Sequence, residues 1–297
     1  MSIFVGVDAG GTKTAVVVAD GERIIGRAFG PPGSVRAGRA LQAASRIASA
    51  VRTALTEAKL IEADVLVVGA AGAGREPERG ELREGLRTER LAQKVIVTGD
   101  LDIALEAAFG QGPGIVLVSG TGSVVVGRTP TGAIHRRGGY GWQMGDEGSG
   151  YAIGRAALQA VGKTQDRRGA GTAIAALLMA GPPKRTFEER VRWSNGAEPG
   201  EVAGVSEVVG KAAEAGDAVA KWIMDRAADD LTTLATSLLA EFGDLAPVPI
   251  ALAGGNIEPG RGLRSFLEST LRAVPRLAVS DVVLRPAEGA LALARRA

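Results

Sequence analysis

Two short glycine-rich turns, about half the chain apart, carry residue types that could bind a phosphate. The first lies in VGVDAGGTKTAVVV (5–18) and the second in IVLVSGTGSVVVG (115–127). Each segment predicts an apolar strand, a tight turn of glycine and hydroxyl residues, and a second apolar strand. Such a turn presents backbone N–H groups with no Cβ in front of them, so a phosphate can approach closely. One turn of this kind also fits an ordinary hairpin, whereas two facing turns would bind a polyphosphate from both sides.

Carboxylates stand where phosphoryl transfer would need them. Asp8 directly precedes the first turn, where it could hold hydrated Mg²⁺ against the phosphates or form an Asx turn that supports the hairpin. Asp100 follows a predicted strand and starts a helix, so it could be a general base or the helix N-cap, and Asp102 competes for both roles. Asp146 and Glu147 share a glycine-flanked loop, and adjacent residues do not share one face, so only one should point into a cleft.

Composition excludes several classes of site. The 297 residues include no cysteine, which excludes disulfides, thiolate metal sites, cysteine nucleophiles and cysteine-ligated iron–sulfur clusters. The single histidine, His135, argues against a serine triad and a His-rich zinc site. The formal charge is +2, but basic and acidic residues are interspersed, so we expect no nucleic-acid partner. The chain shows no leader and no apolar run of membrane-spanning length, so we expect a soluble cytoplasmic protein without a membrane partner.

Hydrophobic periodicity predicts the same element order twice. The first half has expected strands and helices at 3–7, 15–19, 23–28 (strands), 41–58 (helix), 65–69 (strand), 77–92 (helix), 95–98 (strand) and from Leu101 (helix). The second half has them at 115–119, 124–128, 133–136 (strands), 148–243 (several helices), 250–253 (strand), 262–273 (helix), 282–284 (strand) and after Pro286 (helix). Both halves therefore have the order βββαβαβα, with a helical insertion in the second.

The duplicated order predicts an α/β protein of two domains, residues 1–110 and 111–285. Small-molecule sites favour the interface between such domains, so we expect a nucleotide cleft there. The C-terminal helix, residues 286–297, can return to the first domain.

With this order, the chain resembles the sugar kinase, Hsp70 and actin superfamily, whose duplicated ribonuclease-H-like domains bind ATP between facing hairpins. DAGGTKT (8–14) matches the first phosphate motif, SGTGS (119–123) the second, and ALAGGN (251–256) the glycine pair beside the nucleoside. Within the superfamily it is most similar to the N-acetylglucosamine and glucosamine kinases of the BadF/BadG/BcrA/BcrD group. The closer match is carried by VTGDLDIAL (97–105), GGYGWQMGDEGSGYAIG (138–154), DRRGAGTA (166–173) and EAGDAVAKWI (214–223).

The resemblance implies an ATP-dependent kinase of an amino sugar hydroxyl, N-acetylglucosamine or glucosamine at O6, with Mg²⁺ as cofactor. It implies that Asp8 binds Mg²⁺ through water, that Asp100 is the general base and contacts the sugar, and that Asp146 accepts a hydrogen bond from a sugar hydroxyl. The implied ATP-binding residues are Gly10, Gly11, Thr12, Lys13, Thr14, Gly120, Thr121, Gly122, Ser123, Gly254 and Gly255. The implied sugar site also includes Ser34, Gly139 and Tyr140.

Two departures from the family pattern concern the sugar. Tyr140 stands where the family usually has Trp, and Ser34 is the nearest polar residue where these kinases commonly have an asparagine. Two alternatives to a kinase stay open: a relative that hydrolyses ATP to activate another enzyme, and a catalytically silent sugar or nucleotide sensor on the same fold. The missing cysteine argues against the first, because those relatives hold an iron–sulfur cluster. The expected partners are ATP and a small sugar, and the sequence leaves a homodimer open.

Overall fold

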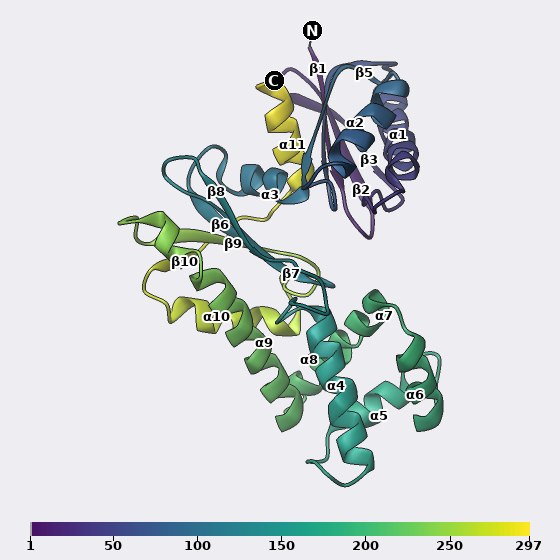
Figure 1. The fold of residues 1–297 in the computed structure, drawn as a ribbon, viewed down its shortest axis with the longest axis vertical. Helices are drawn as coiled ribbons and strands as arrows, with labels where there is room; N and C mark the ends of the chain where they lie inside the picture. The colour runs from purple at the N-terminus through teal and green to yellow at the C-terminus, as the bar shows by residue number, and fades with distance from the viewer. Residues whose placement is uncertain (1) are drawn as a thin grey trace. The chain divides into compact units, whose positions relative to one another are not determined.

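The computed structural model of the chain describes residues 2–297, which form two compact units. The first unit contains the residues up to Gly112 together with Val282–Ala297, and the second contains Pro113–Asp281 (Figure 1). The final segment of the chain therefore belongs to the unit in which the chain begins.

The first unit is built on a five-stranded sheet of order β3-β2-β1-β4-β5. An antiparallel meander of β1 (Ile3–Ala9), β2 (Thr14–Asp20) and β3 (Arg23–Gly30) is extended in parallel by β4 (Ala63–Ala70) and β5 (Ala92–Gly99). Side chains alternate between the faces, so Val16 and Val18 pack toward one helical layer and Val17 toward the other. The two layers are α1 (Ala40–Glu57) with α2 (Glu78–Thr88), and α3 (Asp100–Phe109) with α11 (Pro286–Arg295) (Figure 1).

The second unit repeats this sheet with the order β10-β9-β6-β7-β8. Here β6 (Gly114–Ser119), β7 (Ser123–Arg128) and β8 (Ile134–Gly138) form the meander, and β9 (Val248–Ala253) and β10 (Leu277–Val279) extend it in parallel. The two sheets therefore have the same topology strand for strand. The predicted fold class, a duplicated α/β unit of order βββαβαβα, is confirmed.

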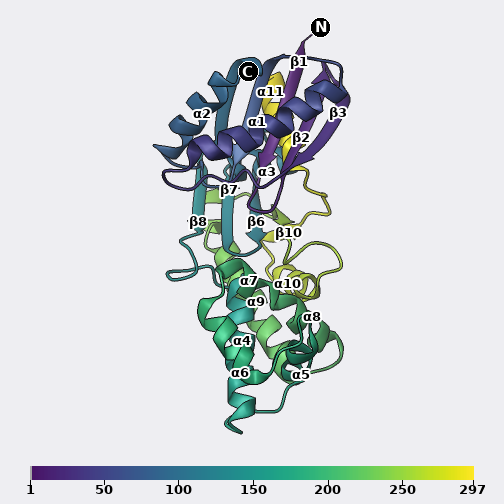
Figure 2. The same ribbon diagram turned by 90° about the vertical axis from the view of Figure 1, so that its right-hand side faces the viewer.

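Most helices of the second unit lie in the insertion between β8 and β9. They are α4 (Gly150–Gln165), α5 (Ala173–Ala180), α6 (Phe187–Gly196), α7 (Pro199–Gly204), α8 (Ser206–Glu214) and α9 (Ala218–Thr236), and α10 (Gly262–Arg272) follows β9. Ile115 and Leu117 of β6 share one hydrophobic core with these helices. The short helices α5, α7 and α8 pack beside α4 (Figure 2). None of the helices described in residues 2–297 has the length and apolarity that crossing a membrane requires.

The strand expected at 282–284 is wrong. The last strand of the second sheet is β10, which pairs in parallel with β9 and sets Leu277 opposite Val248. Val282 and Val283 are 42% and 73% exposed and begin the segment that returns to the first unit. An apolar run forms a strand only where the edge of a sheet can pair with it, and the sequence does not show which sheet edge is available.

The C-terminal helix α11 packs against β1 and α3 with no space for a side chain at two glycines. A Cβ at Gly6 of β1 would lie 2.3 Å from backbone atoms of α11, and a Cβ at Gly289 would lie 2.1 Å from the carbonyl oxygen of Ile103 in α3. Glycine at both positions lets these backbones approach one another. Near the chain end, Arg296 forms a 2.8 Å ion pair with the buried Glu106 of α3.

We expect Gly289→Ala to destabilise the first unit by about 1–3 kcal/mol, because the added methyl group overpacks the α11–α3 contact. The matched control is Gly162→Ala in α4, where a Cβ meets nothing within 4 Å and should add about 0.5–1 kcal/mol of stability. Differential scanning calorimetry is the suitable measurement, because the tryptophans and tyrosines all lie in the second unit and do not report on the first. Equal stability of Gly289→Ala and the wild type would show that α11 can move away from α3.

Candidate functional site

Three parallel strands of the first sheet end side by side. Asp8 of β1 is in register with Gly69 of β4, and Gly69 is in register with Thr98 of β5. Asp100 begins α3 directly after β5 ends at Gly99. Ligands of open α/β sheets bind at the carboxyl ends of parallel strands, and here this edge carries both Asp8 and Asp100.

The N-terminus of α3 separates the roles of its two aspartates. Gly99 is the N-cap residue, and Asp102 Oδ2 accepts its backbone N–H at 3.0 Å as well as the hydroxyl of Thr98. Asp102 therefore supplies the capping carboxylate. Asp100 occupies the first helical position, where its Oδ1 accepts the N–H of Leu101 at 3.1 Å. The alternative in which Asp100 is the N-cap is wrong. Gly99 is the N-cap residue, and the carboxylate that accepts its N–H belongs to Asp102, three residues later.

Asp8 is a half-buried carboxyl group with an unfavourable electrostatic environment. Its burial and then the negative charge of Asp100 raise its pKa to about 6, and Lys13 opposes this increase. No hydrogen bond from any described residue contributes to the pKa of Asp8, so its carboxylate does not form the expected alternative, an Asx turn. Two neighbouring carboxylates repel each other, which favours a proton on one of them or a cation beside them.

The first hairpin divides into an exposed tip and a buried base. Gly11, Thr12 and Lys13 are exposed, and the Lys13 ammonium lies 5.2 Å from the centroid of the Phe29 ring. Thr14 is fully buried, and its hydroxyl donates to the carbonyl oxygen of Pro31 at 2.7 Å. The hydroxyl of Thr14 thus fixes the hairpin, and the tip residues are the ones accessible to a phosphate.

Ser34 lies beside this hairpin. The carbonyl oxygen of Gly10 accepts the N–H groups of Gly33 and Ser34, each at 3.2 Å. The structure therefore brings together the residues predicted in this unit, Asp8, Gly10 to Thr14, Ser34 and Asp100.

The second hairpin has the same division. Thr121 is exposed at the tip, whereas Ser123 is buried and its hydroxyl donates to the Glu147 carbonyl at 2.7 Å. The carbonyl oxygen of Gly120 accepts the N–H of Gly150, in the first turn of α4, at 2.8 Å. The turn is thus fastened to the loop and helix that follow β8.

Asp146 is bound to this hairpin and not turned toward solvent. It is 8% exposed, and its Oδ1 accepts the Ser123 N–H at 3.2 Å. Its backbone is left-handed, with φ of 62°, which is strained for a residue other than glycine. A Cβ at Gly122 would lie 2.7 Å from its Oδ2. Burial raises the pKa of Asp146, and the Ser123 N–H acts in the opposite direction.

The loop that precedes Asp146 carries the remaining predicted sugar residues. Gly139 donates its N–H to the Ser123 carbonyl at 2.9 Å, which fixes the start of the loop to β7. Tyr140 is 62% exposed, and Trp142 packs against Tyr151 with ring centroids 5.3 Å apart. Tyr140 is therefore the more exposed aromatic side chain of this loop, and Trp142 is 45% exposed despite its contact with Tyr151.

Ser119 joins the three loops of the second unit, a role that the sequence did not reveal. Its hydroxyl donates to the Gly148 carbonyl at 3.0 Å and accepts the side-chain amide of Asn256 at 3.1 Å. A Cβ at Gly254 would lie 2.4 Å from the Ser119 carbonyl oxygen, so the glycine pair also packs directly on it. The only sequence signal was the position of Ser119 and Asn256 at the ends of the SGTGS and GGN motifs.

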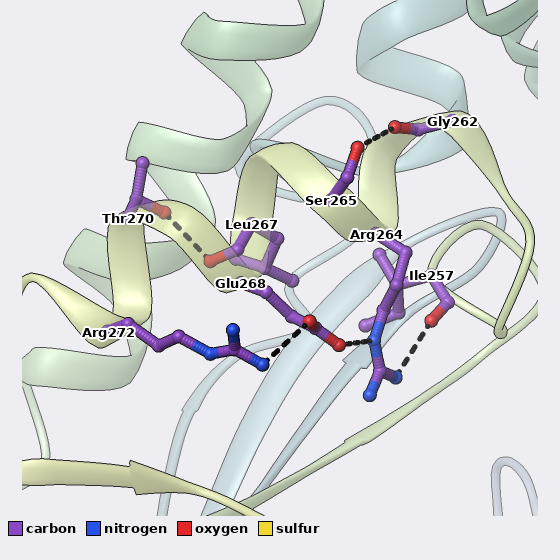
Figure 3. A network of polar contacts seen from close by, with 8 residues as sticks. All are labelled: Ile257, Gly262, Arg264, Ser265, Leu267, Glu268, Thr270 and Arg272. Atoms are coloured by element: carbon purple, nitrogen blue, oxygen red, sulfur yellow. Dashed lines mark hydrogen bonds and ion pairs between the residues drawn. The ribbon is translucent and has the colours of Figure 1, made fainter.

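Helix α10 fixes the loop that follows Gly254 and Gly255. Arg264 donates to the Ile257 carbonyl at 3.2 Å and pairs with Glu268, which also pairs with Arg272 at 3.2 Å (Figure 3). A cavity of about 460 Å³ lies beside this loop, between α8 and the start of α10, and Gly210, Arg261 and Phe266 line it. The predicted residues of the second unit thus border one continuous group of loops, at the carboxyl ends of β6 and β9.

Comparison with known proteins identifies the family to which the chain is similar. The sequence profile of the BadF/BadG/BcrA/BcrD ATPase family matches residues 5–294. An N-acetylmuramic acid/N-acetylglucosamine kinase of Clostridium acetobutylicum is 30% identical over 78% of this chain and 77% of its own length. An N-acetyl-D-glucosamine kinase of Dictyostelium discoideum is 28% identical over 98% of this chain and 97% of its own. A crystal structure from Chromobacterium violaceum, of a protein proposed to be an N-acetylglucosamine kinase, superposes with a TM-score of 0.83 at 25% identity over 99% of each chain.

The raised pKa of Asp8 predicts a pH-dependent stability. Because the folded protein binds this proton more tightly than the unfolded chain does, the stability contributed by Asp8 is greatest below pH 4 and is lost as the pH rises to about 6. The loss amounts to at most about 3 kcal/mol. Asp8→Asn should therefore be more stable than the wild type at pH 7 without ligand, and the difference should disappear near pH 4. Thermal unfolding at both pH values tests this, with Asp20→Asn at the far end of β2 as control. A difference independent of pH would contradict it.

Proposed function

The chain belongs to the BadF/BadG/BcrA/BcrD ATPase family, and on this basis we propose that it is an ATP-dependent kinase of amino sugars. The names of the two curated relatives, which match over most of its length, support this activity. We propose N-acetylglucosamine or glucosamine as the substrate and O6 as the hydroxyl that is phosphorylated. The observation that carries the proposal is the pair of aspartates, Asp8 and Asp100, close enough for the charge of one to raise the pKa of the other.

We assign the phosphates of ATP to the tips of the two hairpins. Gly10 and Gly120 close the two turns, because their N–H groups bond the carbonyl oxygens of Lys13 and Gly122. The turn residues after them offer backbone N–H groups, and Lys13 and Thr121 add an exposed ammonium and hydroxyl group. Thr14 and Ser123 take part by holding the hairpins, since their hydroxyl groups are already bonded. The nucleoside is assigned to Gly254, Gly255 and the adjoining cavity.

The carboxylate of Asp8 suits a magnesium ion that is held through water. In residues 2–297 no three acidic or histidine side chains gather as a metal cluster, so most ligands of such an ion would be water and phosphate oxygens. A hard dication placed here would offset the repulsion between Asp8 and Asp100 and neutralise phosphate charge during transfer. A half-buried carboxyl group that accepts no hydrogen bond fits this role.

We assign the general base to Asp100. Phosphoryl transfer to a hydroxyl group requires positioning of the acceptor and removal of its proton, and a carboxylate at the first position of α3 can do both. Asp102 is occupied by Gly99 and Thr98 and is a poor alternative. Ser34, Gly139, Tyr140 and Asp146 are the proposed contacts to the sugar.

The paired variants Asp100→Asn and Asp102→Asn test the base. Asp100→Asn should keep folding and ATP binding and lower kcat by about 10²- to 10⁴-fold, because an amide cannot take the proton. Asp102→Asn should instead lower stability, by about 1 kcal/mol, with a much smaller effect on turnover. ADP release measured over a panel of sugars gives kcat, and calorimetry gives stability. Near wild-type turnover in folded Asp100→Asn would remove Asp100 from the base role.

A second pair tests recognition of the sugar. Asp146→Asn retains an oxygen that can accept the Ser123 N–H but loses the negative charge, so the KM for the sugar should rise about tenfold or more while the KM for ATP changes little. Asp146→Ala removes both features and should also weaken ATP binding, since it frees the second hairpin. If Asp146→Asn raised the KM for ATP as much as the KM for the sugar, Asp146 would be assigned to support of the second hairpin and not to binding of the sugar.

A further inference from the structure

The helical insertion contains a cavity that the proposed reaction does not use. Its volume is about 580 Å³, and it lies among α5, α6, α7 and α8 (Figure 2). Leucine and valine side chains form much of the wall, for example Leu177 of α5 and Val208 of α8. Arg190, Trp193 and Lys211 add two cations and an indole ring. An apolar wall with a few polar groups is the usual character of a small-molecule site.

Two guanidinium groups meet at one indole ring beside this cavity. The Cζ atoms of Arg190 and Arg185 lie 5.1 Å and 5.5 Å from the ring centroid of Trp193. Arg190 is only 8% exposed; it donates to the Leu178 carbonyl at 2.5 Å, but its Nε has no partner. Nη1 of Arg185 is likewise buried without a partner. Burial, followed by the charge of Arg185, lowers the pKa of Arg190.

The charge of this pair is compensated only in part, since the exposed Glu189 of α6 interacts electrostatically with Arg185. Across residues 2–297, neither guanidinium forms an ion pair with an acidic side chain. Two glutamates also line the cavity, and each has a partner: Glu201 accepts the Trp193 indole N–H at 3.4 Å, and Glu207 pairs with Arg261 at 2.9 Å. Glu189 caps the start of α6. A buried cation without a counter-charge is destabilising, and an anion in the cavity would remove this penalty.

From these contacts we propose that the cavity is a second binding site, which takes a small organic anion. Its carboxylate or phosphate group meets the basic side chains Arg190 and Lys211, and its apolar body lies against Trp193 and the leucines of α5. The anionic group satisfies the unpaired charge, and the apolar body displaces water from the wall. None of these residues belongs to the proposed kinase site, so the proposal does not rest on the proposed kinase activity.

Titration with simple aromatic anions tests the site in the full chain. The chain has three tryptophans, so in a Trp142→Phe, Trp222→Phe background the emission reports Trp193 alone and not phosphate binding at the hairpins. Phenyl phosphate or phenylacetate should change this emission saturably, whereas the neutral benzyl alcohol should bind about tenfold more weakly or not at all. Arg190→Met should weaken anion binding about tenfold or more, since a charged hydrogen bond in a desolvated site has this effect.

Further variants keep the test decisive if Arg190→Met does not fold. Lys211→Gln on α8 should weaken binding, and Lys163→Gln on α4, outside the cavity wall, should not. Far-ultraviolet circular dichroism establishes that each variant is folded. The proposal is overturned if neither anion binds saturably, if benzyl alcohol binds as tightly as the anions, or if the Lys211 variant binds like the wild type.

Discussion

The close approach of α11 to β1 and α3 is the constraint on which the first half of the proposed site depends. Gly6 lies on β1, the strand that carries Asp8, and Gly289 touches the helix that begins at Asp100. Any side chain at these glycines would push the strand and the helix apart, and with them the two aspartates. The C-terminal helix α11 therefore helps to set the positions of Asp8 and Asp100. The ion pair of Arg296 with Glu106 joins the end of the chain to α3.

In the second unit, hydrogen bonds hold the loops of the proposed site in place. Ser119 connects the second hairpin, the loop at Gly148 and the Asn256 loop, and Ser123 adds a bond to the Glu147 carbonyl. In both hairpins the hydroxyl residue that starts the second strand, Thr14 or Ser123, bonds a carbonyl oxygen of a neighbouring loop. This bonding leaves the glycines at the tip as the part that can meet a phosphate, and it holds them rigidly.

Unfavourable electrostatics mark both places where we infer ligands. Asp8 and Asp100 are neighbouring carboxylates, and Arg185 and Arg190 are neighbouring guanidinium groups. Arg190 is buried, and the other three residues are half-buried. Such arrangements lower the stability of the folded chain, and a ligand of opposite charge restores it. The two pairs have opposite sign, so the ligand expected near Asp8 is a cation and the ligand expected near Arg190 is an anion.

The sequence by itself determined the duplicated α/β order and the positions of the glycine turns, because strand and helix periodicity and turn chemistry are local properties. It also identified Asp8, Asp100 and Asp146 as candidates through their motifs. Only the tertiary structure decided which aspartate caps α3, where the last strand pairs, and that Ser119 joins three loops. It alone revealed the Arg190 cavity, whose residues come from four helices with no shared motif. These features depend on contacts between residues far apart in the chain, which local patterns do not encode.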